Sequence, residues 1–444
     1  MQIDSGDAAW VLAASALVLF MTPGLALFYG GLVRRKSVLN MMMMSFSAIG
    51  VVTILWVLYG YSLGFSTDWR SGLLGNLDRV GLGSAIDKVS GTVPELAFAS
   101  FQLMFAIITV ALISGSIADR AKFGGWVVFV ILWATVVYFP VAHWVFFFGD
   151  PKVHGDGGWL GDRLGALDFA GGTVVHANAG AAALALTIVL GRRVGWPRDP
   201  GRPHNVPFVL LGSAILWFGW FGFNAGSALA ANSQAAVAFM NTQVATATAA
   251  LAWISVEKLR SGHATAVGFA SGAVAGLVAI TPACASVDPL GAIVVGGLAG
   301  GICALAVSLK FRLGLDDSLD VVGIHLVAGM LGALLIGFLA TPTVTGILTS
   351  DPGDGPAGLL YGGGLAQLGK QAVAVVSVVT YSFVVTLVLG VIVDKTVGFR
   401  IPREDEIMGV DEVTHAETAY DFGDISRYEV QRVDYYEEGY YEPR

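Results

Sequence analysis

The 444-residue sequence has few charged residues. Aspartate, glutamate, lysine and arginine make up 13% of it, whereas soluble domains carry about 25%. Hydrophobic residues make up 55%, and the mean hydropathy is +0.70. This composition excludes an ordinary soluble domain and predicts an all-α polytopic membrane protein surrounded by membrane lipid.

Cysteine is scarce as well. Cys284 and Cys303 are the only two, too few for a disulfide framework, and no Cys-x-x-Cys pair or histidine-rich cluster indicates a structural metal. No basic segment precedes the first apolar run, so we expect no cleaved signal peptide. Much of the acid behind the net charge of −8 lies in the C-terminal tail, and we expect no nucleic-acid partner and no cofactor.

Long apolar runs make up most of the chain. A helix crosses a bilayer with about 20 residues at 1.5 Å each. Eleven runs are candidates, at about residues 8–31, 38–63, 95–117, 124–147, 168–191, 206–229, 235–255, 264–280, 290–309, 319–339 and 367–393. We expect eleven transmembrane helices, the last one long enough to be tilted.

Basic residues predict the orientation of these helices. Most lysines and arginines follow the first, third, fifth, seventh and ninth runs or begin the tail, and cytoplasmic loops carry such an excess. We therefore expect the amino terminus outside and the carboxyl terminus in the cytoplasm of a cell (plasma) membrane protein. Residues 1–396 would form the transmembrane domain and residues 397–444 a cytoplasmic regulatory tail, of which the last twenty residues are acidic enough to be disordered.

Two histidines lie well inside the apolar runs. His176 follows Asp168 in the fifth run and His325 follows Asp320 in the tenth; His143 lies nearer a run's end, and we interpret it as a structural hydrogen-bonding residue. Ionisable residues inside a membrane are costly and usually functional. The fifth and tenth helices would run in opposite directions, so two inverted five-helix repeats, plus the long eleventh helix, would bring both histidines near the midplane.

A histidine pair has two chemical interpretations. Two close imidazoles can hydrogen-bond a small polar molecule and relay a proton. Zinc or copper would require three or four ligands, and the apolar runs offer no third candidate beside His176 and His325. An integral membrane enzyme with a two-histidine metal site stays open as the remoter hypothesis, and we expect a protein that is not an enzyme.

Aromatic residues cluster in two of the runs. Phe101 and Phe105 lie in the third, and the sixth alternates large rings with glycine over residues 217–223. Most membrane aromatics serve packing or the interface, but glycine beside a large ring leaves room for a narrow pore. Aromatic faces at an entrance would also attract a cation, an interaction worth about 2 kcal/mol when desolvated.

Five segments together resemble the ammonium transporter (Amt) family. They are residues 25–31, 168–176, 220–227, 320–325 and 409–420. The resemblance covers about residues 8–420 and leaves residues 421–444 outside. It implies a homotrimer with one pore per subunit, which conducts ammonium nitrogen inward and accepts methylammonium as an analogue.

The resemblance also implies roles for individual residues. The matching positions are the twin pore histidines His176 and His325, the phenyl gate Phe105 and Phe223, the ammonium recruitment residues Ser227, Phe105 and Phe146, the supporting carboxylates Asp168 and Asp320, and the pore-lining aromatics Trp220 and Phe101. Ammonium would lose a proton near the gate and cross the pore as ammonia.

One position departs from the family pattern. The family commonly has tryptophan three residues after the histidine of the fourth span, whereas Phe146 stands three residues after His143 here. Tryptophan binds cations better than phenylalanine. Either recruitment is weaker in this protein, or Trp144 compensates from a shifted position.

Two further functions stay open beside transport. One is a gas channel like the related Rh proteins. The other is an ammonium sensor that signals through its C-terminal tail, although no recognisable kinase or cyclase domain follows residue 400. In the family the tail is also the docking side for PII-type regulatory proteins, which makes such a protein a candidate partner.

Overall fold

Long helices dominate the computed structural model, which describes residues 2–149, 156–348 and 353–420. Among these residues, ten helical segments are long and apolar enough to cross a membrane. The chain is therefore a multi-pass helical membrane protein. The spans contain α1 (Ser5–Leu32), α2 (Val38–Leu55) continued by η2 (Trp56–Gly60) and α3 (Tyr61–Phe65), α4 (Glu95–Ile113), α5 (Phe123–Trp133) continued by η5 (Ala134–Tyr138) and α6 (Phe139–Phe146), η7 (Gly172–Ala177) with α7 (Asn178–Leu190), α8 (Val206–Gly226), α9 (Ser233–Ser261), α11 (Pro289–Ala306) with α12 (Leu309–Leu313), η8 (Val322–Leu326) with α13 (Val327–Leu339), and α15 (Ala366–Thr396).

Short elements connect the spans. A two-stranded antiparallel sheet precedes α4, and two short helices follow α15. The strands are β1 (Val89–Ser90) and β2 (Val93–Pro94), and the two helices are α16 (Arg403–Met408) and α17 (Val410–His415). The other short segments are α14 (Pro342–Thr345), η1 (Arg35–Ser37), η3 (Gly83–Ala85), η4 (Ser114–Ile117), η6 (Trp159–Arg163), η9 (Gly346–Leu348) and η10 (Leu359–Tyr361).

Each of the eleven predicted spans contains a helix, but the eighth differs from the rest. It is α10 (Ala266–Ile280), with 15 residues, which is shorter than the ten candidate spans. The helix ends just before Pro282, whose nitrogen has no hydrogen to donate to a further helical turn. The buried turn over residues 281–287 completes the apolar run.

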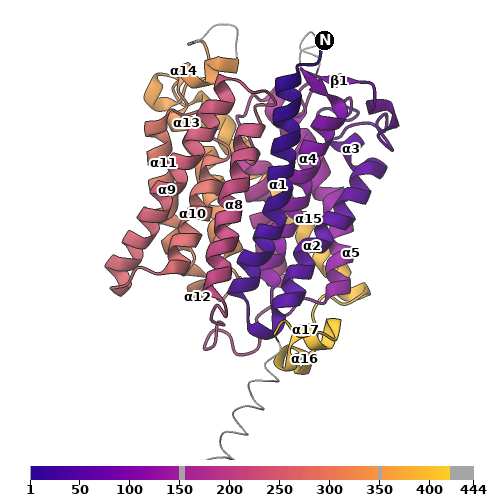
Figure 1. Cartoon of the computed structure of the whole chain (residues 1–444), viewed down its shortest axis with the longest axis vertical. Coiled ribbons are helices and arrows are strands. Elements are labelled where there is room, and N and C mark those ends of the chain that lie inside the picture. Colours follow the sequence, from indigo (N-terminus) through magenta and orange to yellow (C-terminus); the bar gives the residue numbers. More distant parts are fainter. Residues whose placement is uncertain (1, 150–155, 349–352, 421–444) are drawn as a thin grey trace, which may run out of the picture.

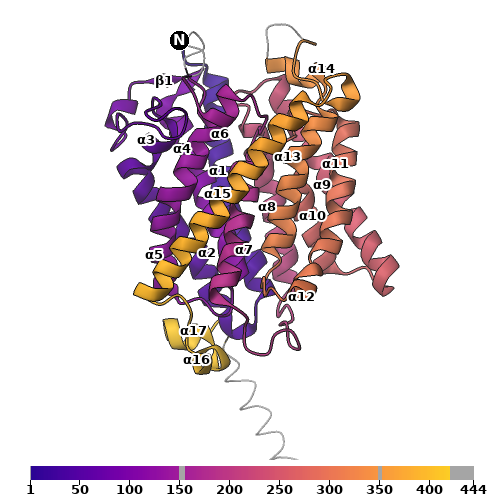
Figure 2. The same ribbon diagram turned by 180° about the vertical axis from the view of Figure 1, so that it is seen from behind.

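The amino terminus and the last helices of the chain lie at opposite ends of the bundle (Figure 1). The amino terminus lies at one end, where Asp4 N donates to Thr92 O beside the small sheet. Helices α16 and α17 lie at the opposite end. Helix α15 runs obliquely along the back of the bundle, contacting α13, α7 and α5 (Figure 2). We call the end that holds the amino terminus the amino end, and the end that holds α16 and α17 the tail end.

Candidate functional site

His176 and His325 meet in the interior of the bundle. Their Nδ1 atoms lie 3.3 Å apart, and their rings stack with centroids 5.4 Å apart. Only 1% of His176 and 3% of His325 is exposed. At this distance one Nδ1 donates a hydrogen and the other accepts it, so the pair shares a single proton between its facing nitrogens.

Two glycines allow this close approach. A Cβ added to Gly180 would lie 2.6 Å from the Cα of Leu326, and one added to Gly329 would lie 2.8 Å from the nitrogen of Ala177. Real Cβ atoms do not approach so closely. Larger residues would therefore separate the two segments that carry the histidines, because small residues set the distance between membrane helices.

Each histidine segment begins with a carboxylate that accepts backbone hydrogen bonds. Asp168 accepts from the amides of Gly171, Gly172 and Thr173 at 2.6–2.9 Å and also from the Thr173 hydroxyl. These amides open η7, where no earlier helical carbonyl is available to them. The negative charge also matches the positive end of the helical dipole.

The counterpart of Asp168 is Asp317, and the prediction of Asp320 for this role is wrong. Asp317 accepts from the amides of Val321 and Val322 at 3.1 and 2.7 Å. Asp317 lies eight residues before His325, as Asp168 lies eight before His176. The sequence prediction matched the nearest aspartate and overlooked this equal spacing, which was the available signal.

Asp320 has a different environment. Its carboxylate pairs with Lys310 Nζ at 2.6 Å and is 35% exposed. It lines a cavity of about 340 Å³ at the tail end, together with Phe28 and Ile324. We call this the tail-end cavity.

Phe105 and Phe223 stack directly on each other. Their ring centroids are 4.1 Å apart with an interplanar angle of 30°, and both rings are buried. Phe101 packs against Phe105 with centroids 4.8 Å apart. Trp220 stacks on His176 at 5.3 Å and donates its indole hydrogen to Thr281 Oγ1 at 2.8 Å. The four aromatic residues therefore form one continuous group next to the histidines.

The predicted recruitment residues line a common cavity at the amino end. Ser227, Phe105 and Phe146 contribute to its wall, and its volume is about 400 Å³. Ser227 Oγ donates to the carbonyl of Phe223 at 2.8 Å, which leaves its oxygen lone pairs available as acceptors. We call this space the amino-end cavity.

Trp144 does not contribute to that wall. Its indole donates to the carbonyl of Leu73 at 2.9 Å, and its ring packs against Trp159 and Tyr381. The alternative in which Trp144 compensates for the phenylalanine at position 146 is therefore not supported, because its ring lies outside the lining of the amino-end cavity.

Three cavities follow one another through the bundle. Phe105 lines the amino-end cavity, and its stacking partner Phe223 lines a small one of about 10 Å³ beside both histidines. Phe28 lines this histidine cavity and also the tail-end cavity. The histidine cavity has the volume of about one water molecule. The series outlines a narrow apolar path that ring movements would have to open.

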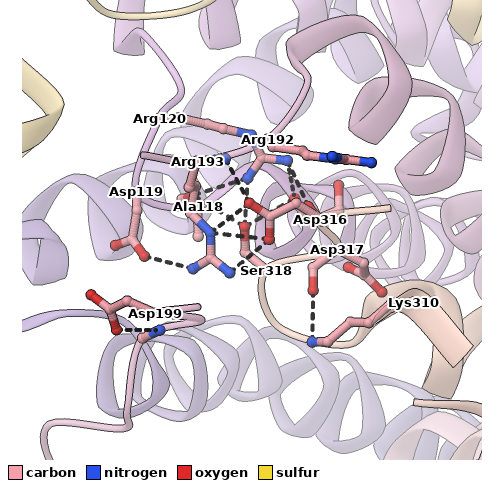
Figure 3. A network of polar contacts seen from close by, with 12 residues as sticks. Ala118, Asp119, Arg120, Arg192, Arg193, Asp199, Lys310, Asp316, Asp317 and Ser318 are labelled. Carbon is pink, nitrogen blue, oxygen red and sulfur yellow. Dashed lines mark hydrogen bonds and ion pairs between the residues drawn. The ribbon is translucent and has the colours of Figure 1, made fainter. Parts of the chain in front are cut away.

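A buried ion-pair network at the tail end was not anticipated from the sequence (Figure 3). The guanidinium of Arg193 makes a bidentate ion pair with the Asp316 carboxylate, with N–O distances of 2.8–3.2 Å. It also donates to Asp119 at 2.9 Å. Arg120 is fully buried and donates to the carbonyl of Asp316 and to Ser318. In the sequence, the arginines looked only like markers of the cytoplasmic side.

The network shifts the pKa values of its members. Burial alone would raise the pKa of Asp316, but hydrogen bonds and the positive charge of Arg193 outweigh burial and hold it below its ordinary value. Burial lowers the pKa of Arg193, and its contacts with Asp316 and Asp119 more than reverse this. Burial lowers the pKa of Arg120 to about 10. All of these groups are charged at neutral pH.

The described part of the tail packs on the bundle. Asp411 accepts from the amides of Leu39 and Asn40 at the start of α2, and Glu406 accepts from Val194 N and pairs with Arg400. Val194 adjoins Arg193, so the tail contacts the ion-pair network through the backbone. The predicted disorder concerns residues outside the described part of the chain.

Metal ligands are sparse around the histidines. Among the described residues, no group of three or more histidine, cysteine, aspartate or glutamate side chains is placed to hold a metal ion. A transition metal requires at least three such ligands in a stable protein site. The geometry therefore gives the metal-enzyme hypothesis no support.

Comparisons with known proteins identify the family of this chain. The model of the family described as Ammonium Transporter Family matches residues 9–420. An ammonium transporter of Mycobacterium tuberculosis is 57% identical over 436 residues, covering 94% of this chain and 91% of that protein. One of Aquifex aeolicus is 49% identical, covering 94% of each.

Solved structures are similar over most of the chain. Mep2 of Candida albicans superposes with a TM-score of 0.83 at 36% identity, covering 91% of this chain and 88% of that chain. A protein described as a sensor Amt protein superposes with a TM-score of 0.82 at 27% identity, covering 92% and 98%.

Proposed function

The chain belongs to the ammonium transporter family and is an ammonium transporter, and we propose that it takes up ammonium at the amino-end cavity, removes a proton near the phenyl gate and conducts ammonia past the histidine pair. The series of three cavities carries this proposal. The ring centroid of Phe223 lies 4.1 Å from that of Phe105 and 5.9 Å from that of His176. The Phe223 ring therefore separates the cation-accessible amino-end cavity from the imidazoles.

The apolar path explains why the proton would be removed. An unpaired ion loses several kcal/mol of hydration free energy when it enters an apolar interior, whereas neutral ammonia loses much less. The rings of Phe105 and Phe146 would stabilise the cation before this step through cation–π attraction. Ser227 would accept one of its hydrogens, and Phe101 and Trp220 would complete the aromatic wall.

The histidines would then hydrogen-bond ammonia along the path. His176 and His325 both line the histidine cavity, and His176 Nε2 has no hydrogen-bond partner among the described residues. A neutral imidazole nitrogen can donate or accept according to its tautomer. The facing Nδ1 atoms share a proton, which supplies a route for proton relay beside the path of the nitrogen.

We extend the proposal to topology and assembly. Eleven helices, including the short α10, would cross a plasma membrane as two inverted five-helix repeats plus α15, with the amino end outside. Opposite placement of the amino terminus and the tail helices supports this arrangement, as does the equal aspartate–histidine spacing in η7 and η8. The transmembrane domain would be residues 1–396, the regulatory tail residues 397–444, and the assembly a homotrimer.

Sensing is the second candidate function. Helix α17 contacts the first turn of α2, and α16 contacts the loop that carries Val194, both at the tail end. The fold resembles that of the sensor Amt protein. A PII-type regulatory protein would bind at this tail end. Transport and sensing are compatible, because the tail contacts do not obstruct the lining of the histidine cavity.

Uptake of labelled methylammonium by cells that lack other ammonium transporters tests the proposal. We expect Ser227→Leu to reduce uptake strongly, because the larger apolar side chain fills the recruitment site and removes its oxygen. Ser255→Leu is the matched control, since Ser255 makes the same type of hydrogen bond to the carbonyl four residues earlier but lies on an exposed surface. Equal uptake by both variants would contradict recruitment at Ser227.

A histidine substitution tests the second half of the path. We expect His176→Ala to slow uptake more than tenfold, whereas His263→Ala, at an exposed position, should leave it unchanged. Unchanged uptake in the His176 variant would remove any obligatory role of that imidazole. It would leave the transport function itself standing.

A further inference from the structure

A carboxylate with no assigned role lies in the wall of the amino-end cavity. Glu95 begins α4, and its Oε1 accepts hydrogen bonds from Arg79 Nε at 2.7 Å and from the Tyr61 hydroxyl at 3.1 Å. All three side chains line the cavity. None of them belongs to the recruitment residues, the phenyl gate or the histidine pair.

The position of Glu95 separates it from the gate. Phe105 lies ten residues further along the same helix, which corresponds to about 15 Å of helical rise. Glu95 therefore lies toward the mouth of the cavity and Phe105 at its far end. A cation that reaches the gate must first pass the part of the cavity that contains the carboxylate.

The two charges of the ion pair are unequally screened. The Glu95 side chain is 9% exposed, whereas the Arg79 side chain is 29% exposed. Water screens the more exposed charge more strongly, so the carboxylate dominates the field inside the cavity. Glu95 Oε2 also accepts no hydrogen bond from the described residues, because both of its neighbours use Oε1.

Aromatic rings border this carboxylate. Phe65 and Phe98 line the same cavity, with ring centroids 5.3 Å apart, and Tyr61 stacks on Phe65. A carboxylate oxygen accepts charge-assisted hydrogen bonds from N–H donors, and ring faces attract the same cation. An ammonium ion offers four N–H donors and a methylammonium ion three, so both fit this combination.

We propose that Glu95 is a first cation-binding group at the mouth of the amino-end cavity, and that Arg79 limits its strength by competing for the same carboxylate. Ammonium would donate to Oε2 of Glu95 before it moves on to Ser227 and the phenyl gate. This inference rests on the proposed function and adds an earlier step to it. Removing the charge of Glu95 should therefore weaken cation binding, and removing the charge of Arg79 should strengthen it.

Charge-removing variants of the full chain test the inference through the methylammonium concentration that gives half-maximal uptake. We expect Glu95→Gln to raise this concentration about threefold and Arg79→Gln to lower it about threefold, as one partly screened charge would. Glutamine matches the shape of glutamate at position 95, and at position 79 it removes the charge but keeps a polar side chain that can donate hydrogen bonds. The matched controls are Asp87→Asn and Arg70→Gln, which remove charges outside the cavity lining and should change nothing.

Two more variants separate charge from structure. Glu95→Asp keeps the charge and should remain close to the wild type, whereas Tyr61→Phe removes a hydrogen bond without changing charge and should have little effect. The inference is overturned if Glu95→Gln and Arg79→Gln shift the concentration in the same direction, if neither differs from its control, or if Tyr61→Phe reproduces Glu95→Gln. Wild-type protein without saturable uptake would instead overturn the proposed function, and the inference with it.

Discussion

The two histidine segments are built alike but supported differently. Before η7 and before η8, an aspartate eight residues ahead of the histidine accepts hydrogen bonds from amides at the start of the helical segment. Asp168 is held by neutral donors from its own segment. Asp317 adjoins Asp316, which pairs with Arg193 in the buried network.

The two aspartates therefore differ in where their surroundings come from. Asp168 has a local support, made by its own segment, and Asp317 has an assembled support, made by loops from several parts of the chain. The hydrogen bonds to the Asp168 carboxylate all come from residues 171–174 of the same segment. The η8 support combines the loops after α4, α7 and α12 through buried charges, and the tail contacts it at Val194. A change in the tail can therefore act directly on the loops that support the His325 segment, whereas the amides that Asp168 accepts from lie at the other end of the helical segment that ends near Arg193.

Removing the central charge of the assembled support should have the largest effect. Arg193→Met would leave Asp316 and Asp119 buried without their cation, which typically costs about 4 kcal/mol. Arg192→Met is the matched control: Arg192 stacks on Trp196 and donates to a carbonyl, and we expect a loss of less than about 1 kcal/mol. Thermal unfolding of the purified proteins measures both, and equal losses would contradict a special role of the buried charge.

Removing the local support should have the next largest effect. Asp168→Ala leaves several buried donors without an acceptor, and we expect a loss of about 3 kcal/mol, compared with about 2 kcal/mol for Asp317→Ala, which has fewer donors. The same unfolding measurement compares the two. A larger loss for Asp317→Ala would show that the ion-pair network, and not the number of amides, determines the support.

The sequence predicted much of this architecture because its signals are local. Apolar run length identified the helix positions, and the aromatic and histidine positions of the path followed from the family motifs. Asp320 was assigned the role that Asp317 has, and the role of Trp144 was left open, because both depend on backbone contacts and ring packing that the sequence does not show. The Arg193 network was missed because loop arginines are expected on the cytoplasmic side whether or not they are buried.

Single and double substitutions of the histidine pair test whether the two segments act together. We expect His176→Ala and His325→Ala to slow methylammonium uptake by non-additive factors, with a coupling of about 1 kcal/mol in the double-mutant cycle. The shared proton between their Nδ1 atoms is the physical reason, because losing either ring ends the sharing. Strictly multiplicative effects would mean that the two imidazoles work independently.

The smallest expected effect is a dependence of stability on acidity at the tail end. Because hydrogen bonds and the charge of Arg193 hold the pKa of Asp316 below its ordinary value of 3.8, this carboxylate stabilises the fold above that pH. The contribution should disappear as the pH falls from 3.8 through the lower folded-state value. Asp316→Asn should lack this acid-dependent part of the unfolding temperature; an unchanged acid dependence would contradict the assignment.

The central claim is that ammonium nitrogen crosses the apolar path as a neutral molecule. Proteoliposomes that contain the purified protein can be supplied with labelled methylammonium or with radioactive rubidium, a potassium analogue that has no proton to release. We predict saturable uptake of methylammonium and no protein-dependent uptake of rubidium at the same concentration. Equal uptake of the two ions would contradict deprotonation at the gate, because it would mean that intact cations pass Phe105 and Phe223.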